Sequence, residues 1–225
     1  MLKINKNMRI KIVEDGPYMV TGDIPLCEKI IKHDGKKYIY SEGKKYRRSR
    51  GYALCRCGKS KNHPFCDGQH MDNFDGTETA SKEKFKDRAR VFVGPGIDLL
   101  DDGRCAIARF CHEEHGSVWQ LVKKSDDPEC KEEVIRGAIN CPTGRLVAVE
   151  KNGEEIELHL EPSIEILQDP EKGVSGPYYI KGNIPIESVD GTTYEVRNRA
   201  ALCRCGKSKD TPFCDGAHIK SDFKD

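Results

Sequence analysis

The feature that most constrains the fold of this chain is an internal repeat near its two ends. Residues 16–25 read Gly-Pro-Tyr-Met-Val-Thr-Gly-Asp-Ile-Pro, and residues 176–185 read Gly-Pro-Tyr-Tyr-Ile-Lys-Gly-Asn-Ile-Pro. Each copy continues through an Asp-Gly turn, at 34–35 or 190–191, with Tyr, Val and Ile close by. This pattern predicts a β-hairpin in each copy. The chain therefore reads as repeat, insert, repeat.

Each repeat ends in three cysteines and one histidine with the same spacing, Cys-x-Cys-x8-Cys-x3-His. The residues are Cys55, Cys57, Cys66 and His70 in the first copy and Cys203, Cys205, Cys214 and His218 in the second. Four soft or borderline ligands in one short loop suit tetrahedral metal coordination. Cys66 and His70 are four residues apart, so a short helix capped by Asp67 would turn both side chains to one centre.

The two copies differ in length before their cysteines. From Tyr18 to Cys55 the chain advances 37 residues, and from Tyr178 to Cys203 it advances 25. The first copy therefore carries twelve extra residues, near 30–45, which are basic and are expected to lengthen a hairpin.

Composition separates metal binding from disulfide bonding. The chain has eleven cysteines, an odd number, and no secretory signal or membrane-spanning apolar run is evident in the sequence. We therefore expect a cytoplasmic protein whose clustered cysteines bind metal. The net charge of +1 gives no basis for binding nucleic acid or an anionic membrane.

The spacing alone leaves a structural zinc site open, because cysteine and histidine serve zinc equally well. That alternative describes a zinc-stabilised interaction module without a redox role. Zinc sites usually contain Cys-x2-Cys pairs, whereas these motifs contain Cys-x-Cys, which suits a binuclear cluster in which two irons share the ligands.

Both motifs resemble the CDGSH iron–sulfur domain family of the mitoNEET type, whose pattern is C-x-C-x2-(S/T)-x3-P-x-C-D-G-(S/A/T)-H. Ser60, Pro64, Asp67 and Gly68 fit this pattern in the first copy, and Ser208, Pro212, Asp215 and Gly216 fit it in the second. The single departure is Gln69, where the family has a small residue. Gln69 is not at a ligand position, so we expect altered packing around the cluster and not its loss.

The resemblance implies a 2Fe–2S cluster in each motif, held by the three cysteines and the histidine. It also implies that the two copies exchange strands to form a β-cap, here as a pseudo-dimer within one chain. A neutral histidine ligand raises the reduction potential relative to an all-cysteine cluster, and its protonation makes the cluster acid-labile. Lys59 and nearby backbone amides are candidate hydrogen-bond donors to the cluster.

The middle of the chain contains four further cysteines, at 105, 111, 130 and 141. Cys141 is followed by Pro142 after a helical pattern at 131–139, and two strand-like runs, 145–149 and 156–160, flank Asn152-Gly153. The segment resembles a divergent single-cluster bacterial ferredoxin whose middle cysteine is replaced by Ala108.

That resemblance implies a 3Fe–4S cluster on Cys105, Cys111 and Cys141. Cys130 is a candidate fourth ligand of a 4Fe–4S cluster, and buried thiols or a zinc site are the alternatives without a cluster. Cys27 has no counterpart in the second copy, where Glu187 aligns with it, and is expected to be a free thiol.

We therefore predict a mainly β fold with small α+β parts, in three units: 1–76, 77–162 and 163–225. The expected function is electron transfer with an unidentified redox partner protein, and the alternatives are cluster storage or transfer and redox or pH sensing. No nucleotide-binding or catalytic pattern supports an enzyme. The protein is expected to be a monomer with an internal pseudo-two-fold axis, or a homo-oligomer.

Overall fold

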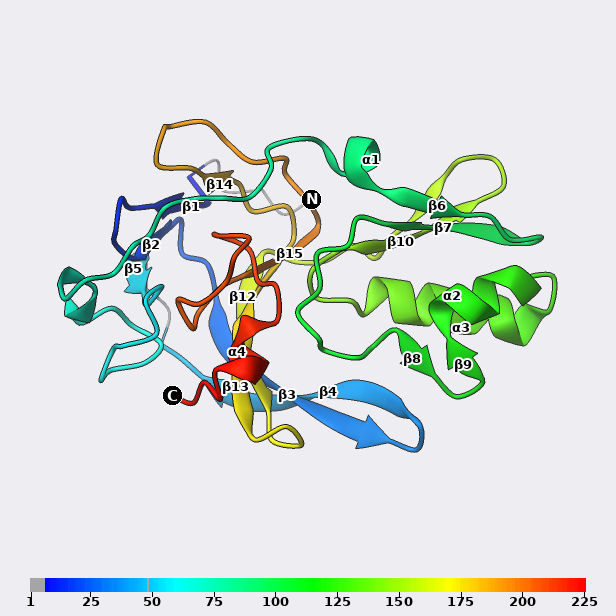
Figure 1. The fold of residues 1–225 in the computed structure, drawn as a ribbon, viewed down its shortest axis with the longest axis horizontal. Coiled ribbons are helices and arrows are strands. Elements are labelled where there is room, and N and C mark those ends of the chain that lie inside the picture. The colour runs from blue at the N-terminus through cyan, green and yellow to red at the C-terminus, as the bar shows by residue number, and fades with distance from the viewer. Residues whose placement is uncertain (1–6, 48) are drawn as a thin grey trace.

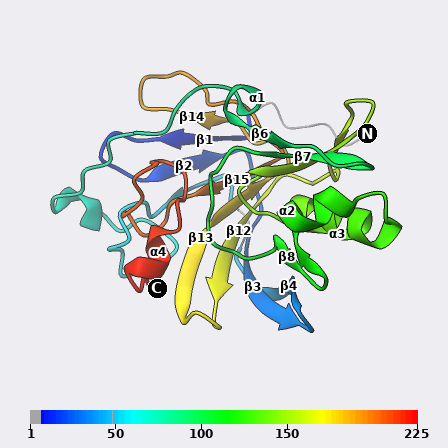
Figure 2. The same ribbon diagram turned by 45° about the vertical axis from the view of Figure 1, so that its right-hand side comes forward.

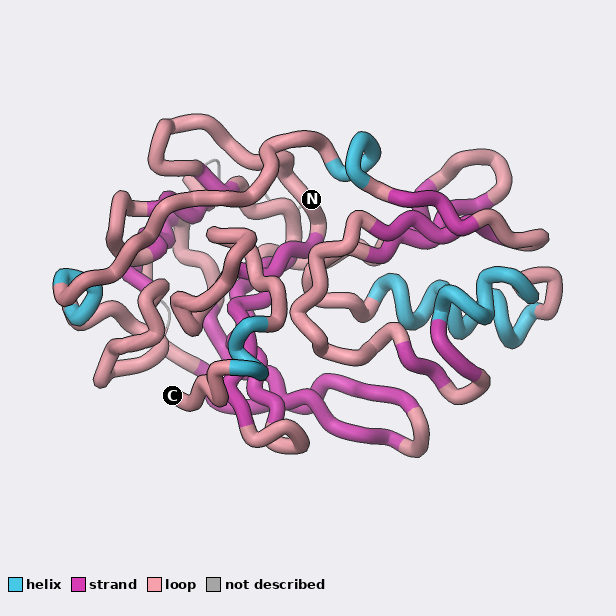
Figure 3. The backbone as a smooth tube through the Cα atoms, in the orientation of Figure 1, coloured by secondary structure: helices cyan, strands magenta, loops and turns pink. Residues whose placement is uncertain are grey.

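The computed structural model describes residues 7–47 and 49–225 and is built mainly from short strands, as predicted (Figure 1). Two sheets made from the repeats form a β-cap, and the insert forms a separate lobe beside them. Long loops join the last strand of each repeat to a short helix, and these loops carry the repeated cysteines (Figure 3). Within the described residues, no helix is long and apolar enough to cross a membrane.

The first repeat supplies five strands and a short 3-10 helix. These are β1 (Arg9–Ile12), β2 (Tyr18–Thr21), β3 (Leu26–Asp34), β4 (Lys37–Lys45), β5 (Gly51–Leu54) and η1 (Gln69–Met71). The second repeat supplies β12 (Ser163–Asp169), β13 (Val174–Lys181), β14 (Ile186–Glu187), β15 (Arg199–Leu202) and α4 (Ala217–Lys220).

The repeats exchange one strand each. In the first sheet, of order β14-β1-β2-β5, β14 of the second repeat pairs parallel with β1, with Ile186 opposite Ile10. In the other sheet, of order β15-β13-β12-β3-β4, β3 of the first repeat pairs parallel with β12, with Leu26 opposite Ile164. The predicted internal pseudo-dimer is therefore confirmed, and each sheet needs both repeats to be complete.

Alternating apolar residues on these strands form a shared core. Its members include Ile10, Tyr18, Val20, Leu54, Ile164, Tyr178, Ile180 and Leu202, all at most 2% exposed. Both repeats contribute to this one cluster, so neither half buries its apolar face alone.

The extra length of the first repeat is a long hairpin, β3 and β4, which turns between Asp34 and Lys37 as expected from Asp34-Gly35. Its Tyr40 ring stacks on Phe110 of the insert at 4.2 Å between centroids, and the Tyr40 hydroxyl donates to the Asn140 carbonyl at 2.9 Å. The hairpin therefore holds the insert against the cap.

The insert is an α+β lobe. Its elements are α1 (Phe85–Arg88), β6 (Arg90–Phe92), β7 (Ile97–Asp101), β8 (His112–Glu113), β9 (Gly116–Ser117), α2 (Val118–Leu121), η2 (Val122–Lys124), α3 (Pro128–Ile139), β10 (Leu146–Glu150) and β11 (Glu155–Ile156). The antiparallel sheet has the order β11-β10-β7-β6, and α2 and α3 lie beside it (Figure 2). Val134 and Ala138 of α3 pack with Leu99, Leu146 and Ala148 of the sheet.

Candidate metal centres

Each repeated cysteine loop folds back on the end of its own repeat's last strand. In the first motif the Cys55 amide donates to the Pro64 carbonyl at 2.8 Å, and the Cys66 amide donates to the Ala53 carbonyl at 2.9 Å. The second motif repeats both bonds at the same lengths, from Cys203 to Pro212 and from Cys214 to Ala201. These bonds bring the third cysteine of each motif beside the first two.

The four candidate ligands of each motif meet in two pairs. The Sγ atoms of Cys55 and Cys57 are 3.7 Å apart, and Cys66 Sγ lies 3.3 Å from His70 Nδ1. In the second motif the Sγ atoms of Cys203 and Cys205 are also 3.7 Å apart. The remaining pair, Cys214 Sγ and His218 Nδ1, is separated by 3.4 Å.

These separations match those of two ligands on one tetrahedral metal ion. Two sulfurs at about 2.3 Å from a tetrahedral centre lie about 3.8 Å apart, and a sulfur and an imidazole nitrogen lie about 3.5 Å apart. Among residues 7–47 and 49–225, no three His, Cys, Asp or Glu side chains are placed to hold a single metal ion. The donors are thus arranged as two pairs, which fits a centre of two metal ions better than a mononuclear site.

Backbone amides surround the first two sulfurs of each motif. The Lys59 amide lies 3.4 Å from Cys57 Sγ. Burial raises the pKa of the Cys55 thiol to about 11, and the amides of Gly58 and Ser60 oppose this rise. In the second motif the Cys205 thiol and then the amides of Gly206 and Ser208 lower the pKa of Cys203 to about 6. Because metal binding requires thiolates, these amides favour the state that binds metal.

The aspartate that follows the third cysteine of each motif has a different role from the one predicted. Gly68 and Gly216, both with positive φ, are the N-caps of η1 and α4. Asp67 instead accepts hydrogen bonds from the Lys61 amide at 2.7 Å and the Gln69 amide at 3.3 Å, so it braces the loop. Lys59 was expected to donate a hydrogen bond to the cluster. Its ammonium instead donates to the Asp72 carbonyl at 2.6 Å.

Two tyrosines, which the sequence analysis did not assign to the sites, cross between the motifs. Tyr178 donates to the carbonyls of Cys55 and Pro64, each at 3.0 Å. Tyr18 donates to the carbonyls of Cys203 and Pro212 at 2.9 and 3.1 Å. Each repeat therefore supports the cysteine loop of the other, and the repeated Gly-Pro-Tyr was the signal that could have shown it.

The two cysteine loops also touch directly. A β-carbon at Gly58 would lie 2.5 Å from the Cys205 carbonyl oxygen, and one at Gly206 would lie 2.4 Å from the Cys57 carbonyl oxygen. Both glycines have positive φ. Glycine is therefore needed at both positions, for conformation and for close approach.

In the insert, three of the four cysteines, Cys105, Cys111 and Cys141, lie close enough to one another for their thiols to interact electrostatically. Burial, with the thiols of Cys141 and Cys105 nearby, raises the pKa of Cys111 to about 12. The Arg145 guanidinium hydrogen-bonds to the Asp101 carboxylate at 2.7 and 2.5 Å and interacts electrostatically with the nearby Cys105 thiol. The chemistry here is three thiols beside one cation, which suits an anionic cluster.

Cys130 lies apart from this group. It is in the first turn of α3, whereas Cys141 follows the helix end at Ile139. Nine residues of helix from Cys130 to Ile139 span about 14 Å. The two cysteines therefore lie toward opposite ends of α3, which favours three thiol ligands over the alternative in which Cys130 completes a four-iron site. Cys27, on β3, is partly exposed and lies outside all three groups, as expected for a free thiol.

The central cysteine loop packs on the second repeated motif. Ala106 forms a buried cluster with Ala201 and Cys214, and the Cys105 and Cys214 thiols interact electrostatically. A β-carbon at Gly216 would lie 2.5 Å from Ile107 Cδ1. This contact sets the surroundings of the second motif apart from those of the first.

Burial of the two motifs differs accordingly. Cys214 and His218 are 3% and 4% exposed, whereas Cys66 and His70 are only partly buried. Burial, and then the Arg204 guanidinium, lowers the pKa of His218 to about 4.

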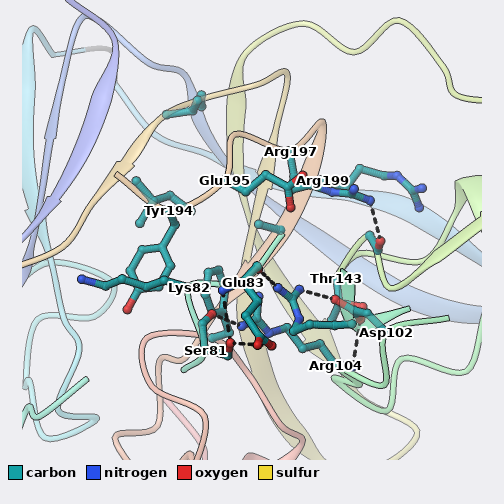
Figure 4. Close-up of a pocket in the computed structure, with 16 residues that line it drawn as sticks. Ser81, Lys82, Glu83, Asp102, Arg104, Thr143, Tyr194, Glu195, Arg197 and Arg199 are labelled. Atoms are coloured by element: carbon teal, nitrogen blue, oxygen red, sulfur yellow. Dashed lines mark hydrogen bonds and ion pairs between the residues drawn. The ribbon is translucent and has the colours of Figure 1, made fainter. Parts of the chain in front are cut away.

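A small cavity follows the seam between the insert and the second repeat (Figure 4). Arg88 pairs with Asp102 at 2.7 Å, and Arg104 donates to the Ser81 carbonyl at 2.9 Å. The cavity holds about 30 Å³, room for a few water molecules at most. It is therefore a packed seam that fixes the start of the central cysteine loop.

Comparisons with known protein families agree with this division of the chain. Residues 15–71 and 175–219 match the family model described as iron-binding zinc finger, CDGSH type. Residues 93–151 match the model described as divergent 4Fe-4S mono-cluster. No significant match was found among curated proteins or among solved structures.

Proposed function

Because this chain is an iron–sulfur protein of the CDGSH family with a ferredoxin-like insert between its two motifs, we propose that it is an electron carrier with three clusters. Two 2Fe–2S clusters would be held by Cys55, Cys57, Cys66 and His70 and by Cys203, Cys205, Cys214 and His218. A third would be held by Cys105, Cys111 and Cys141. When bound, such clusters accept and donate single electrons.

The observation that carries this proposal is the contact of the three cysteine loops in a row. The first and second motifs touch at Gly58 and Gly206, and the second motif touches the central loop at Gly216 and Ile107. Backbone carbonyls and side chains fill these contacts. In space the second motif lies between the first motif and the central loop. This arrangement supports stepwise electron transfer from one site to the next.

Charged side chains beside the sites support anionic clusters. Arg204 lies between two candidate ligands, is 1% exposed and pairs with Asp225. Its counterpart Arg56 is 4% exposed and donates to the Gly76 carbonyl at 2.5 Å. Arg145 places a positive charge beside the Cys105 thiol of the central group.

The type of the central cluster follows from its thiols. Ala108 stands where the ferredoxin pattern has its middle cysteine, and it is buried against Ile31 and Leu167. With Cys130 distant, three thiols remain among the described residues, which supports a 3Fe–4S cluster. A 4Fe–4S cluster, as in the name of the matching family, would need a ligand that is not cysteine.

The chain would need protein partners to supply and accept electrons. Strand exchange within one chain completes both sheets of the cap and so supports a monomer as the working unit. We also propose a cytoplasmic location, because thiol-based metal sites persist in reducing compartments.

The test is analysis of iron, zinc and acid-labile sulfide per chain on anaerobically purified protein, with EPR spectra before and after dithionite. About seven irons and an EPR signal in the oxidised state would support two 2Fe–2S and one 3Fe–4S cluster. About four irons would restrict the proposal to the repeated motifs. Stoichiometric zinc without sulfide would overturn it in favour of a zinc-stabilised module.

A second candidate function is cluster transfer from the first motif. Cys66 and His70 are partly exposed, so an acceptor protein could reach this pair, whereas the equivalent pair in the second motif is buried. Mixing the loaded protein with an apo-ferredoxin tests it. Gain of the acceptor's visible spectrum, with loss of about two irons from this chain, would support transfer, and no gain would exclude it for that acceptor.

A further inference from the structure

The surface above the junction of the second motif and the central cysteine loop is hollow and basic. The hollow measures about 440 Å³ and is lined by Ile107 and Gly216, with Lys207, Lys209 and Lys220 around them. All three lysines are exposed. The candidate ligands Cys214 and Cys105 lie close to Gly216, which lines the hollow. The hollow is therefore a part of the surface near two of the three candidate sites.

Nearby carboxylates do not balance these three lysines, because two of the carboxylates pair with other cations and only Asp215 keeps its charge at the hollow. Asp210 pairs with Arg104 at 3.1 Å, and Asp222 pairs with Lys224 at 3.1 Å. Asp215, also at the hollow, accepts the amides of Lys209 and Ala217, each at 2.9 Å. The rim thus has an excess of positive charge although the whole chain has a net charge of only +1.

Ile107 gives the hollow an apolar centre. It has a φ of 57°, a left-handed conformation that is unfavourable for a β-branched residue. Its side chain lies against Gly216 and remains 38% exposed. An exposed apolar residue within a ring of like charges is the arrangement of a protein-docking surface, with an apolar core and a charged rim.

The first motif lacks this arrangement. Lys59 and Lys61 occupy the positions of Lys207 and Lys209, but Asp72 stands where the second motif has Lys220. The Lys59 ammonium is held by the Asp72 carbonyl at 2.6 Å. Within the described part of the chain, a β-carbon at Gly68, the counterpart of Gly216, would meet Met71 and no residue of the insert.

We propose that the hollow rimmed by Lys207, Lys209 and Lys220 docks an acidic single-electron carrier protein. This inference rests on the proposed electron-transfer function and names the partner's charge and entry point. In each encounter the carrier loses one electron and this protein gains one, so no further reactant is required. Opposite charges raise the association rate of such partners by roughly 10- to 1000-fold at low salt.

The test measures reduction of the cluster-loaded, full-length protein by stopped-flow absorbance. Reduced flavodoxin, an acidic flavoprotein, is the donor, and reduced methyl viologen, a small cationic one-electron donor of low potential, is the donor of opposite charge. The variant is Lys209→Glu/Lys220→Glu. The matched control is Lys123→Glu/Lys124→Glu, which changes the net charge equally at two exposed lysines on η2 of the insert. Iron content and circular dichroism verify that each variant is loaded and folded.

We expect wild-type reduction by flavodoxin to slow as salt rises, and the docking variant to be at least about tenfold slower at low salt. The control should stay within about twofold of wild type. Equal rates for the docking variant and the control with flavodoxin, or an equal slowing of the docking variant with reduced methyl viologen, would overturn the docking surface while leaving electron transfer intact. A wild type that dithionite reduces but neither carrier does would instead overturn the electron-transfer function itself.

Discussion

The two CDGSH motifs have the same ligand spacing and the same loop hydrogen bonds, yet one lies near solvent and the other is enclosed. In the first motif Cys66 and His70 are partly exposed, and in the second Cys214 and His218 are nearly inaccessible. The difference comes from the insert, which packs on the second motif through Ile107 and Ala106. Near-identical sequences thus acquire different environments through tertiary packing alone.

Arginine pairing adds to this difference. Arg204 forms an ion pair with Asp225, whereas Arg56 lies over the rings of Tyr18 and Phe74 and forms no ion pair within the described residues. Arg56 is therefore the less compensated of the two buried arginines. A cluster in the first motif should be the easier one to reduce, because positive surroundings stabilise the added electron.

The largest expected effect tests what the motifs share. Tyr18→Phe and Tyr178→Phe each remove a buried hydroxyl that donates to two carbonyls of the other motif. Each should lower the free energy of unfolding by about 2 kcal/mol, because the buried carbonyl of Cys203 or Cys55 loses the hydroxyl donor, whereas the proline carbonyl keeps the cysteine amide. Denaturant unfolding of the loaded protein measures this. A large loss for one tyrosine and none for the other would contradict the pseudo-two-fold support.

A smaller effect should separate the motifs. Gly216→Ala places a methyl group 2.5 Å from Ile107, at a φ of 85°, whereas Gly68→Ala meets only the flexible end of Met71 at 3.2 Å, at a φ of 94°. Backbone strain affects both, so we expect losses of about 2 and about 1 kcal/mol respectively. The same unfolding experiment compares them. Equal losses would mean that the insert does not press on the second motif.

A pH effect should depend on a residue that only the first motif has. His63 stands where the second motif has Thr211. Its ring packs edge-to-face on the Phe223 ring, with 5.8 Å between the ring centroids. Burial lowers the pKa of His63, so below its ordinary pKa of about 6.5 the unfolded chain binds a proton that the folded chain resists. Its contribution to stability is therefore complete above about pH 6.5 and declines as the pH falls.

We expect wild type to lose up to about 1 kcal/mol more than His63→Thr between about pH 7.5 and about pH 5.5. Unfolding curves of both proteins at both pH values give this difference. Parallel pH dependence in the two proteins would exclude His63 as the source.

The smallest effect concerns the ion pair of the second motif. Asp225→Asn removes the carboxylate that compensates Arg204, so the reduction potential of the second site should rise by tens of millivolts. An EPR-monitored redox titration measures it. Asp72→Asn, an exposed aspartate beside the first motif, is the control and should shift little. A fall in the potential would show that Asp225 does not balance the charge of Arg204.

The sequence predicted the features that the two motifs share better than it predicted their different exposure to solvent. Repetition of Gly-Pro-Tyr and of the cysteine spacing indicated paired units, and the strand exchange followed from the family resemblance. The helix predicted over 131–139 lies within α3, and Asn152-Gly153 turns between β10 and β11. The expected strands were too long: the second runs only over Glu155–Ile156, and the hairpin at Asp190-Gly191 is reduced to one bridge between Glu187 and Thr193. Such local signals are read from neighbouring residues and so survive in a single sequence.

The position of the insert could not be predicted in this way. It depends on the stacking of Tyr40 on Phe110 and on the fit of Ile107 over Gly216, contacts between residues 70 and 109 positions apart. Neither pair has a local pattern. The domain limits at 76 and 162 and the ligand roles of the cysteines stay predictions.

The most direct test of the account is whether the central cluster interacts magnetically with the second site and not with the first. EPR spectra of the dithionite-reduced wild type, Cys66→Ala and Cys214→Ala would be compared after iron analysis has shown that the remaining sites are loaded. The account predicts that broadening or splitting between the centres persists in Cys66→Ala and disappears in Cys214→Ala. Persistence in Cys214→Ala with loss in Cys66→Ala would contradict it and place the central cluster beside the first motif.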